Sequence, residues 1–512
     1  MKTLMLAMAL AYAIPAMGQE VVELKLPQSS KVVVKLMFRN GSICDPKGME
    51  GLTYLTASLV AEGGTADMTF SQIQEAIYPM AANYGVSVDK EVCVFTFEVH
   101  RDWLTKFYPI LRGLILTPSF ADQDFQRIKV NQQTYVDQLI RASSDEEYSK
   151  MALEDLLFRG TNYQHMKQGT SPGVKAITLD DIRKHYASFF THSNLMIGVA
   201  GGYDDAFLKM LMEDMANLPG TNPVVPKPGA ARTPSGIEVE IVAKNDAFGS
   251  AIFAGVPLNL TRAGNDFPAL MVANSYLGEH RKSYSKLYQE IRENRSMNYG
   301  DYSYIEWYEN GGGNMLPQPG VPRSSNYFSI WIRPVQIAAQ LRKQYPELAD
   351  VKVGHAHFAL RMALHELGVL VSQGMTEEQF QATRTFLQSY VKLYVQTPSD
   401  RLGYLMDSRV YGRKDYINDL GARLAALTRE DVNRAIKKYW SPERMFVTIV
   451  TNTSEVEPLA KSLRENQPSP MSYSKVVKSG LAAEVREKDA VVEKLSLKVT
   501  SVNIVNSKDT FR

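Results

Sequence analysis

The fold is decided by one apolar stretch near the start of the chain, Gly51-Leu52-Thr53-Tyr54-Leu55-Thr56-Ala57-Ser58-Leu59-Val60-Ala61-Glu62-Gly63-Gly64-Thr65. Leu52, Leu55 and Leu59 recur at positions i, i+3 and i+7. This spacing places the three side chains on one face of a helix. We therefore expect a helix over 51–61 whose leucine face packs into a core.

Working outward, a segment of the first half recurs later in the chain. Residues 176–199 match residues 426–449 without a gap, at a constant offset of 250 residues. Each copy begins with a Thr-x-x-Asp pattern, at Thr178 and Thr428, which can cap the N-terminus of a helix. Each predicted helix leads into an apolar strand. The repeat therefore predicts two structurally related halves.

Within each half, the predicted order of elements is strand, helix, strands, paired long helices, capped helix and strand. This order is typical of an α+β domain in which helices pack on a largely antiparallel sheet. Residues 218–229 contain four prolines, which favour an extended spacer between the halves. The predicted organisation is a leader over 1–18, a first domain over 19–218, a linker over 219–235, a second domain over 236–456 and an extension over 457–512.

Composition narrows the classes of partner. The chain has 512 residues, of which 45% are apolar, enough for more than one core. Its 57 Lys and Arg residues nearly balance 55 Asp and Glu residues, giving a net charge of +2. This balance gives no electrostatic footprint for nucleic acid or for an anionic membrane. We expect neither partner.

The N-terminus has the layout of a secretory signal. Met1-Lys2-Thr3 precedes an apolar run over Leu4–Ala13, and small residues at Ala16 and Gly18 mark a cleavage point, so the mature chain would begin near Gln19. The run is shorter than the ~20 residues that a membrane-spanning anchor needs, and it lacks the arginines of a mitochondrial presequence. We therefore expect export into the periplasm or out of the cell.

The chain has only two cysteines, Cys44 and Cys93. Export would permit them to form a disulfide, since both flank predicted strands of the first half. Two unrelated buried thiols are the equal alternative. Two cysteines are too few for a cysteine-based metal cluster.

The opening stretch resembles the G-L-x-H-x-x-E-H helix of the insulinase and pitrilysin peptidases, which are called inverzincins. In that frame Tyr54 and Ser58 occupy the positions of the two histidines, and Ala57 occupies that of the glutamate that activates water. The family also needs a distant acidic ligand, but the corresponding window, 128–136, contains no carboxylate. A catalytic zinc requires His, Cys or carboxylate ligands. The resemblance therefore implies a LuxS/MPP-like metallopeptidase fold without a metal or other cofactor of its own.

A second motif lies in the second half, where Leu287–Tyr304 resembles the family segment L-R-E-x-x-x-x-x-Y. In these peptidases an Arg and a Tyr seven positions apart reach from the C-terminal half toward the active site. Arg292 and Tyr299 have this spacing. The resemblance implies that Arg292 binds a substrate carbonyl and that Tyr299 donates a hydrogen bond to the oxyanion.

Alternatives remain for both residues. Arg295 competes for the arginine role and Tyr302 for the tyrosine role. Arg292 could also close a helix or form an i+4 pair, while Tyr299 could simply pack in a strand.

Two further features have no catalytic assignment. His357, Arg361 and His365 fall on one helical face, with His355 nearby. Because Arg361 disfavours a bound cation, we expect a solvated or partner-facing basic stripe rather than a metal site. Residues 310–322 form a Gly- and Pro-rich loop, either a surface connector or a loop that contacts substrate.

In the two-chain members of this family, one subunit carries zinc and the other has lost the motif but supplies the Arg and the Tyr. The resemblance therefore implies that this chain is the catalytically incomplete subunit of a heterodimeric zinc peptidase. Its partner would hold zinc, and its substrates would be short, unstructured peptides. A scaffold or peptide-holding protein of the same fold is one alternative. A hydrolase with an independent site is another, but the sequence has no Gly-x-Ser-x-Gly motif.

Overall fold

The computed structural model of the protein describes residues 20–511 apart from 143, 281, 307–317 and 394. The first half consists of β1 (Glu20–Lys25), β2 (Lys31–Phe38), α1 (Leu52–Glu62), α2 (Phe70–Ile77), β3 (Asn83–Val88), β4 (Cys93–His100), α3 (Leu104–Leu116), α4 (Asp122–Thr134), α5 (Ile140–Ala142), α6 (Asp145–Leu157), α7 (Ser171–Ala176), α8 (Leu179–Phe189), β5 (Leu195–Gly201) and α9 (Asp205–Met215). The predicted leader over 1–18 and most of the predicted loop over 310–322 lie outside the described residues.

The second half repeats this order. It consists of β6 (Ile237–Ala243), β7 (Ser250–Leu258), α10 (Phe267–Gly278), a π-helical segment (Tyr288–Glu293), β8 (Asp301–Tyr304), β9 (Asn326–Val335), α11 (Ala338–Gln344), α12 (Ala356–Gln373), α13 (Glu377–Leu393), α14 (Pro398–Val410), α15 (Tyr416–Ala426), α16 (Arg429–Tyr439), β10 (Met445–Thr451) and α17 (Thr453–Arg464). The chain then continues through α18 (Lys475–Gly480), α19 (Ala483–Val492) and β11 (Val499–Asn506).

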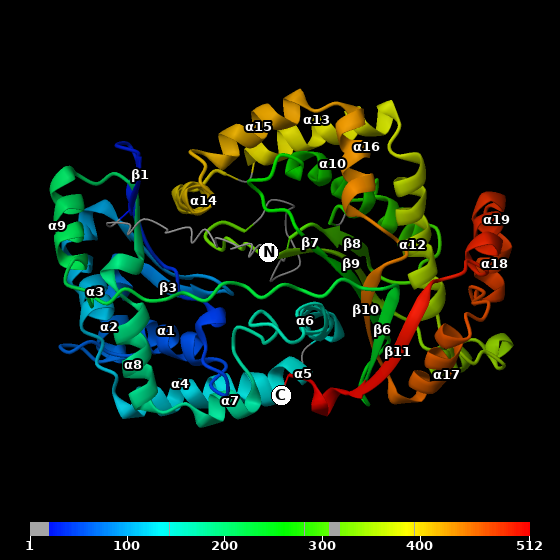
Figure 1. The fold of residues 1–512 in the computed structure, drawn as a ribbon, viewed down its shortest axis with the longest axis horizontal. Helices are drawn as coiled ribbons and strands as arrows, with labels where there is room; N and C mark the ends of the chain where they lie inside the picture. Colours follow the sequence, from blue (N-terminus) through cyan, green and yellow to red (C-terminus); the bar gives the residue numbers. More distant parts are fainter. Residues whose placement is uncertain (1–19, 143, 281, 307–317, 394, 512) are drawn as a thin grey trace, which may run out of the picture.

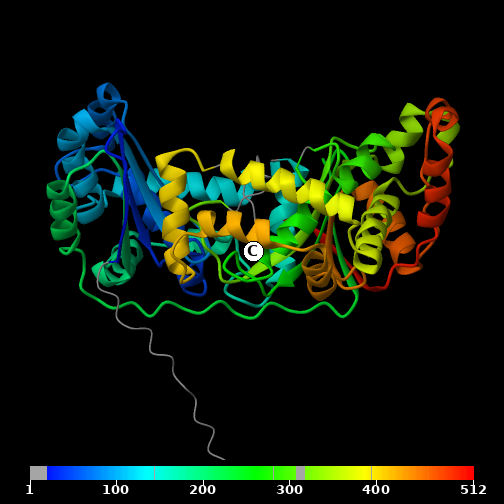
Figure 2. The same ribbon diagram turned by 90° about the horizontal axis from the view of Figure 1, so that it is seen from above.

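The two sheets have the same topology. The first has the strand order β1-β5-β2-β4-β3, and the second has the equivalent order β6-β10-β7-β9-β8 with β11 added at its edge. In each sheet the first and last strands of the half pair in parallel, β11 also pairs with β6 in parallel, and the remaining pairs are antiparallel. The α+β fold with two related, largely antiparallel halves is therefore confirmed, and Figure 2 shows them as the two ends of a bowed molecule.

The repeated segment has the predicted local structure in both halves. Thr178 and Thr428 each accept a hydrogen bond from the backbone N–H of the third following residue, an aspartate, whose carboxylate in turn accepts from the threonine N–H. These capping boxes satisfy N–H groups that the first turn of a helix leaves unpaired. Helices α8 and α16 then lead into the fully buried strands β5 and β10.

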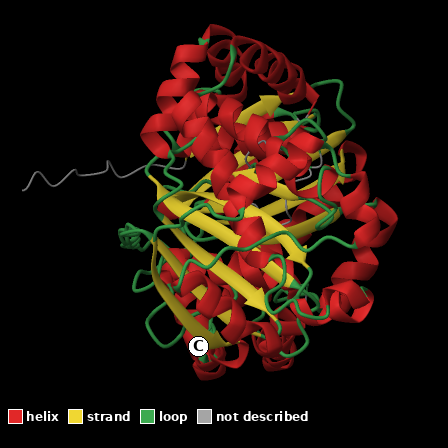
Figure 3. Ribbon diagram, turned by 90° about the vertical axis from the view of Figure 1, so that its right-hand side faces the viewer, coloured by secondary structure: helices red, strands yellow, loops and turns green. Residues whose placement is uncertain are grey.

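Each half also contributes one helix to the sheet of the other half. Helix α6 of the first half packs on β7 and β10 of the second sheet, and α14 of the second half packs on β1 and β5 of the first. The two helices occupy equivalent places in the repeat, and Figure 1 shows both between the sheets. In the end-on view, helices lie above, below and to one side of the strands (Figure 3). The space between the sheets is therefore filled by an exchange of helices.

The linker and the C-terminal extension both cross between the halves. Residues 219–234 form neither helix nor strand, and Figure 1 shows them running across the face of the molecule. The predicted boundary at 456 is wrong, because it falls inside α17, which ends at Arg464. The extension adds the single strand β11, parallel to β6, together with two helices. Its Phe511 packs on Tyr148 of the first half, with ring centroids 5.2 Å apart.

The two cysteines are not paired. Cys44 and Cys93 are both free and buried, so the disulfide alternative is wrong in this structure. Burial raises the pKa of the Cys44 thiol to about 12. No helix among the described residues is both long and apolar enough to cross a bilayer.

Candidate functional site

The predicted helix over 51–61 is α1, and it is almost completely buried. Its leucine face packs against Phe125, Ile128 and Ile182 of the neighbouring helices, as the spacing of the leucines predicts. A carboxylate from the preceding loop caps its N-terminus, because Asp45 accepts hydrogen bonds from the backbone N–H groups of Gly51 and Thr53, each at 2.7 Å. Helix α1 is thus part of the hydrophobic core of the first half, which is called the first core below.

The positions of the two zinc-binding histidines and of the water-activating glutamate are now part of this packing. Ala57 lies fully buried in the first core, Ser58 is buried, and the half-buried Tyr54 packs on the core. In the window of the distant acidic ligand, the amide of Gln132 donates hydrogen bonds to the carbonyl oxygens of Gly51 and Gln168 at 3.0 and 2.8 Å. An amide therefore ties α4 to the start of α1 where the family has a ligand. These side chains do not fit a catalytic zinc.

No other metal site replaces it in the described part of the chain. Among those residues, no group of three His, Cys, Asp or Glu side chains is arranged to hold a metal ion. The predicted solvated stripe on α12 is also wrong, because His357 and Arg361 are fully buried. Arg361 donates to the carbonyl oxygens of Gln467 and Leu495, and His357 contacts the Ser462 hydroxyl. This face of α12 anchors the C-terminal extension.

Arg292 and Tyr299 lie together at the surface. They line an open hollow of about 300 Å³ with Glu293, Ser296 and Asn298. The Arg292 guanidinium pairs with Glu293 at 2.9 Å and lies 5.9 Å from the centroid of the Tyr299 ring. Tyr299 is 79% exposed, so it does not pack in a core as the structural alternative requires.

The two rival residues are buried. Arg295 is 2% exposed and pairs with Asp489 and Glu290 at 2.8 and 3.1 Å, an arrangement that joins the extension to the second half. Tyr302 is 1% exposed and stacks on His280 in the interior. Of the two candidate arginines and the two candidate tyrosines, only Arg292 and Tyr299 are accessible to another molecule. Their catalytic roles stay predictions.

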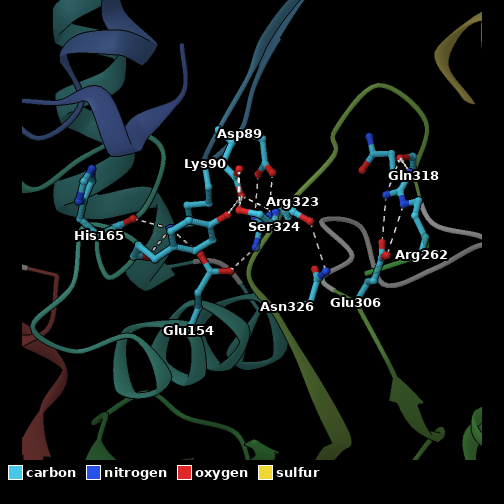
Figure 4. A network of polar contacts seen from close by, with 12 residues as sticks. Asp89, Lys90, Glu154, His165, Arg262, Glu306, Gln318, Arg323, Ser324 and Asn326 are labelled. Carbon is cyan, nitrogen blue, oxygen red and sulfur yellow. Dashed lines mark hydrogen bonds and ion pairs between the residues drawn. The ribbon is translucent and has the colours of Figure 1, made fainter. Parts of the chain in front are cut away.

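A buried network of charges joins the two halves (Figure 4). Arg323 of the second half pairs with Asp89 of the β3–β4 loop at 2.7 Å and with Glu154 of α6 at 2.9 Å. Lys90 pairs with the same Glu154 at 2.6 Å. Burial acts to raise the pKa of Asp89, but the charge of Arg323 outweighs it and lowers that pKa. Paired, these groups fix the relative position of the halves, since separating them would leave charges buried and uncompensated.

A second buried group of charges holds α14 in place. Arg262 pairs with Glu306 at 3.0 Å and with Asp407 of α14 at 2.8 Å, and it donates to the Gln318 carbonyl. Burial raises the pKa of Asp407 to about 6 despite the neighbouring Arg262. Sequence reasoning missed both groups, because their members are far apart in the chain and become partners only in the folded structure.

Comparisons with known proteins agree with this geometry. The sequence profile described as insulinase (peptidase family M16) matches residues 20–170, and that described as peptidase M16 inactive domain matches residues 176–332. The chain belongs to the M16 peptidase family. As an M16 protein it is 25% identical over 188 residues to the non-peptidase homolog YmxG of Helicobacter pylori, covering 36% of this chain and 43% of that one. It is 24% identical over 277 residues to the uncharacterized zinc protease SCO5738 of Streptomyces coelicolor, covering 53% and 52%. The matched region thus spans about half the length of these M16 relatives, or less.

Two solved structures share the fold of this chain. A peptidase M16 inactive domain from Pseudomonas fluorescens matches with a TM-score of 0.71 at 18% identity, covering 85% of this chain and 96% of that one. A protease from Helicobacter pylori matches with a TM-score of 0.68 at 14% identity, covering 85% and 97%. The family and the fold are therefore established, and this member carries side chains unsuited to zinc at the motif helix.

Proposed function

We propose that this chain is the zinc-free subunit of a two-chain M16 peptidase and that it supplies Arg292 and Tyr299 to an active site whose zinc lies in a homologous partner. The observation that carries the proposal is that the exposed Tyr299 and the partly exposed Arg292 line one open hollow. Arg292 also pairs with Glu293 and lies over the Tyr288 ring, but this Arg–Tyr pair borders an open hollow. It is suited to a site completed by another molecule.

The joint between the halves supports the need for a partner. The space between the two sheets holds α6 and α14, and buried ion pairs lock the halves together. We therefore propose that a second chain supplies the surface that completes a peptide chamber facing Arg292 and Tyr299.

In the proposed reaction the partner's zinc and general base would activate water. Arg292 would offer planar N–H donors to a carbonyl of the peptide. The Tyr299 hydroxyl would donate a hydrogen bond to the oxyanion that forms as water attacks, and a donor of this kind contributes about 3 kcal/mol in enzymes where it has been removed. We propose short, unstructured peptides as substrates and the periplasm or the cell exterior as the location.

A non-enzymatic scaffold of the same fold is the second candidate. The name of the H. pylori relative, a non-peptidase homolog, favours it. The two candidates differ in whether Arg292 and Tyr299 affect turnover.

The test is to produce the mature chain alone and together with a histidine-bearing M16 homologue from the same source, and to measure bound zinc and cleavage of a quenched peptide. We expect no stoichiometric zinc and no turnover from the lone chain, and turnover above that of the homologue alone in the mixture. Arg292→Ala and Tyr299→Phe should each lower kcat/KM about 100-fold. Arg434→Ala and Tyr78→Phe, at exposed sites elsewhere, are the matched controls. Mixing without any gain would favour the scaffold.

A further inference from the structure

The Tyr299 ring has little packing to hold it. With 79% of its surface exposed, its position depends on the backbone turn that presents it rather than on neighbouring side chains. A hydrogen-bond donor stabilises an oxyanion only if it is held near the place where the charge develops. The turn around Tyr299 is therefore where the orientation of this residue is set.

Asn298 spans that turn with hydrogen bonds in three directions. Its Oδ1 accepts from the backbone N–H of Gly300 at 3.0 Å, which closes a local turn around Tyr299. Its Nδ2 donates to Asp301 Oδ1 at 2.8 Å and to the Arg333 carbonyl of β9 at 2.9 Å. The side chain thus connects the turn to the sheet.

The backbone at Gly300 makes the turn specific. Gly300 has φ +153°, and a Cβ atom there would lie 2.3 Å from the Tyr302 hydroxyl oxygen. Glycine is therefore required at this position. Tyr299 is therefore flanked in the sequence by Asn298, whose side chain bridges the turn, and by Gly300, where glycine is required.

Asp301 is the buried residue that accepts one of the hydrogen bonds from Asn298. It is the first residue of β8, pairs with Ile332 of β9, and is fully buried. Its Oδ2 has no hydrogen-bond partner among the described residues. Burial raises the pKa of the Asp301 carboxyl well above its usual range, although Arg333 and Arg292 act against this. A neutral acid can still accept the hydrogen bond from Asn298 through Oδ1.

We propose that Asn298 and Asp301 are positioning residues that hold the Tyr299 turn in the orientation needed for oxyanion contact. This inference rests on the role proposed for Tyr299. The hydrogen bonds from Asn298 to Gly300, Asp301 and Arg333 form the brace, and Asp301 is its buried acceptor. Neither side chain needs to touch the substrate.

The test is a double-mutant cycle in the mixture with the zinc-bearing homologue. We expect Asn298→Ala to lower kcat about tenfold with KM little changed, and to lower it less than twofold in a Tyr299→Phe background, since the brace then has no donor to position. Equal losses in both backgrounds would overturn the proposal. If Asn298→Ala does not fold, Asn298→Ser keeps an acceptor for Gly300 and should give a smaller loss with the same dependence on Tyr299.

The matched control is Asn452. Its Oδ1 accepts from the backbone N–H of Ser454 at 3.1 Å and its Nδ2 donates to the Asn245 carbonyl at 2.8 Å, the same local geometry far from the hollow. Asn452→Ala should leave kcat unchanged. A loss with Asn298→Ala no greater than with Asn452→Ala would overturn the proposal. Asp301→Asn, which retains an acceptor, should keep kcat within about twofold, whereas Asp301→Leu should lower it.

A second readout does not depend on turnover. A fluorotyrosine placed at position 299 of the isolated chain reports the environment of the ring by fluorine NMR. Asn298→Ala should move its resonance toward that of a free, solvated tyrosine, and Asn452→Ala should not. An unchanged resonance in Asn298→Ala would overturn the proposal that Asn298 positions Tyr299. If Tyr299→Phe leaves turnover intact while the resonance moves, the proposed function fails but the brace stands.

Discussion

The motif helix α1 and the Arg292–Tyr299 segment belong to related halves, but the side chains of the first are buried and those of the second are accessible. Around α1, the positions of the family's zinc ligands and of its general base have become part of the packing, with Ala57 and Ser58 buried and Gln132 of α4 bonding backbone carbonyls. In the second half, Arg292 and Tyr299 remain at the surface around an open hollow. A residue without a binding role can be absorbed into packing, whereas one that must meet another molecule has to stay accessible.

The largest expected effect comes from restoring the glutamate of the motif. Ala57→Glu would force a carboxylate into the closed first core, and we expect a loss of about 4 kcal/mol in the free energy of unfolding. Tyr299→Glu, at an exposed site, should change it by less than about 0.5 kcal/mol. Urea denaturation of the isolated chain measures both. Similar changes in the free energy of unfolding for Ala57→Glu and Tyr299→Glu would contradict the contrast between the closed packing around Ala57 and the exposed position of Tyr299.

The next largest expected effect on stability comes from comparing the carboxyl groups at the ends of the equivalent helices α1 and α10. Glu62 is exposed at the end of α1, but Glu279 is buried after α10, and burial raises its pKa to about 8 even with Lys282 nearby. Because the folded state holds this proton more tightly than the unfolded state, stability is present at low pH and is lost as the pH rises from about 4.5 to about 8. Glu279→Gln should therefore gain about 3 kcal/mol relative to the native chain between pH 5 and pH 8.

Urea denaturation at the two pH values measures this gain, and Glu62→Gln is the control that should show none. A constant difference between Glu279→Gln and the native chain would contradict the assigned protonation. A gain with Glu62→Gln would show that the effect does not come from the buried carboxyl.

A smaller effect is expected where an amide replaces the distant ligand. Gln132→Ala would remove the side-chain donor to the Gln168 carbonyl oxygen and one of the two donors to the Gly51 carbonyl oxygen, so we expect a loss of about 2 kcal/mol. Gln126→Ala, an exposed position on the same helix, should cost almost nothing. Thermal unfolding monitored by circular dichroism compares the two. Equal melting temperatures would contradict a structural role for Gln132.

Much of this contrast could be predicted from the sequence. The leucine spacing predicted the buried face of α1, and the 250-residue repeat predicted two halves that have the same strand order. The Arg292–Tyr299 spacing identified two residues that share one hollow. These features depend on local periodicity or on a short motif, which a single sequence retains.

The rest depends on contacts between distant segments. The spacing of His357 and Arg361 gave no sign that the C-terminal extension would cover them, so the predicted solvated stripe was wrong. The ion pair of Arg323 with Glu154 depends on α6 crossing to the second sheet, and its pair with Asp89 depends on the β3–β4 loop of the first half meeting the second half. By contrast, the Asn-x-Gly pattern around Tyr299 is a local turn signal that could have indicated the brace.

The central claim is that Arg292 and Tyr299 act on a zinc site held by another chain. The most direct measurement is a titration of a fixed amount of the zinc-bearing homologue with this chain, following cleavage of a quenched peptide. We expect activity to rise to a plateau at one chain per homologue and to stay at the level of the homologue alone with the Arg292→Ala/Tyr299→Phe double variant. An equal rise with the double variant, or turnover by this chain without the homologue, would contradict the claim.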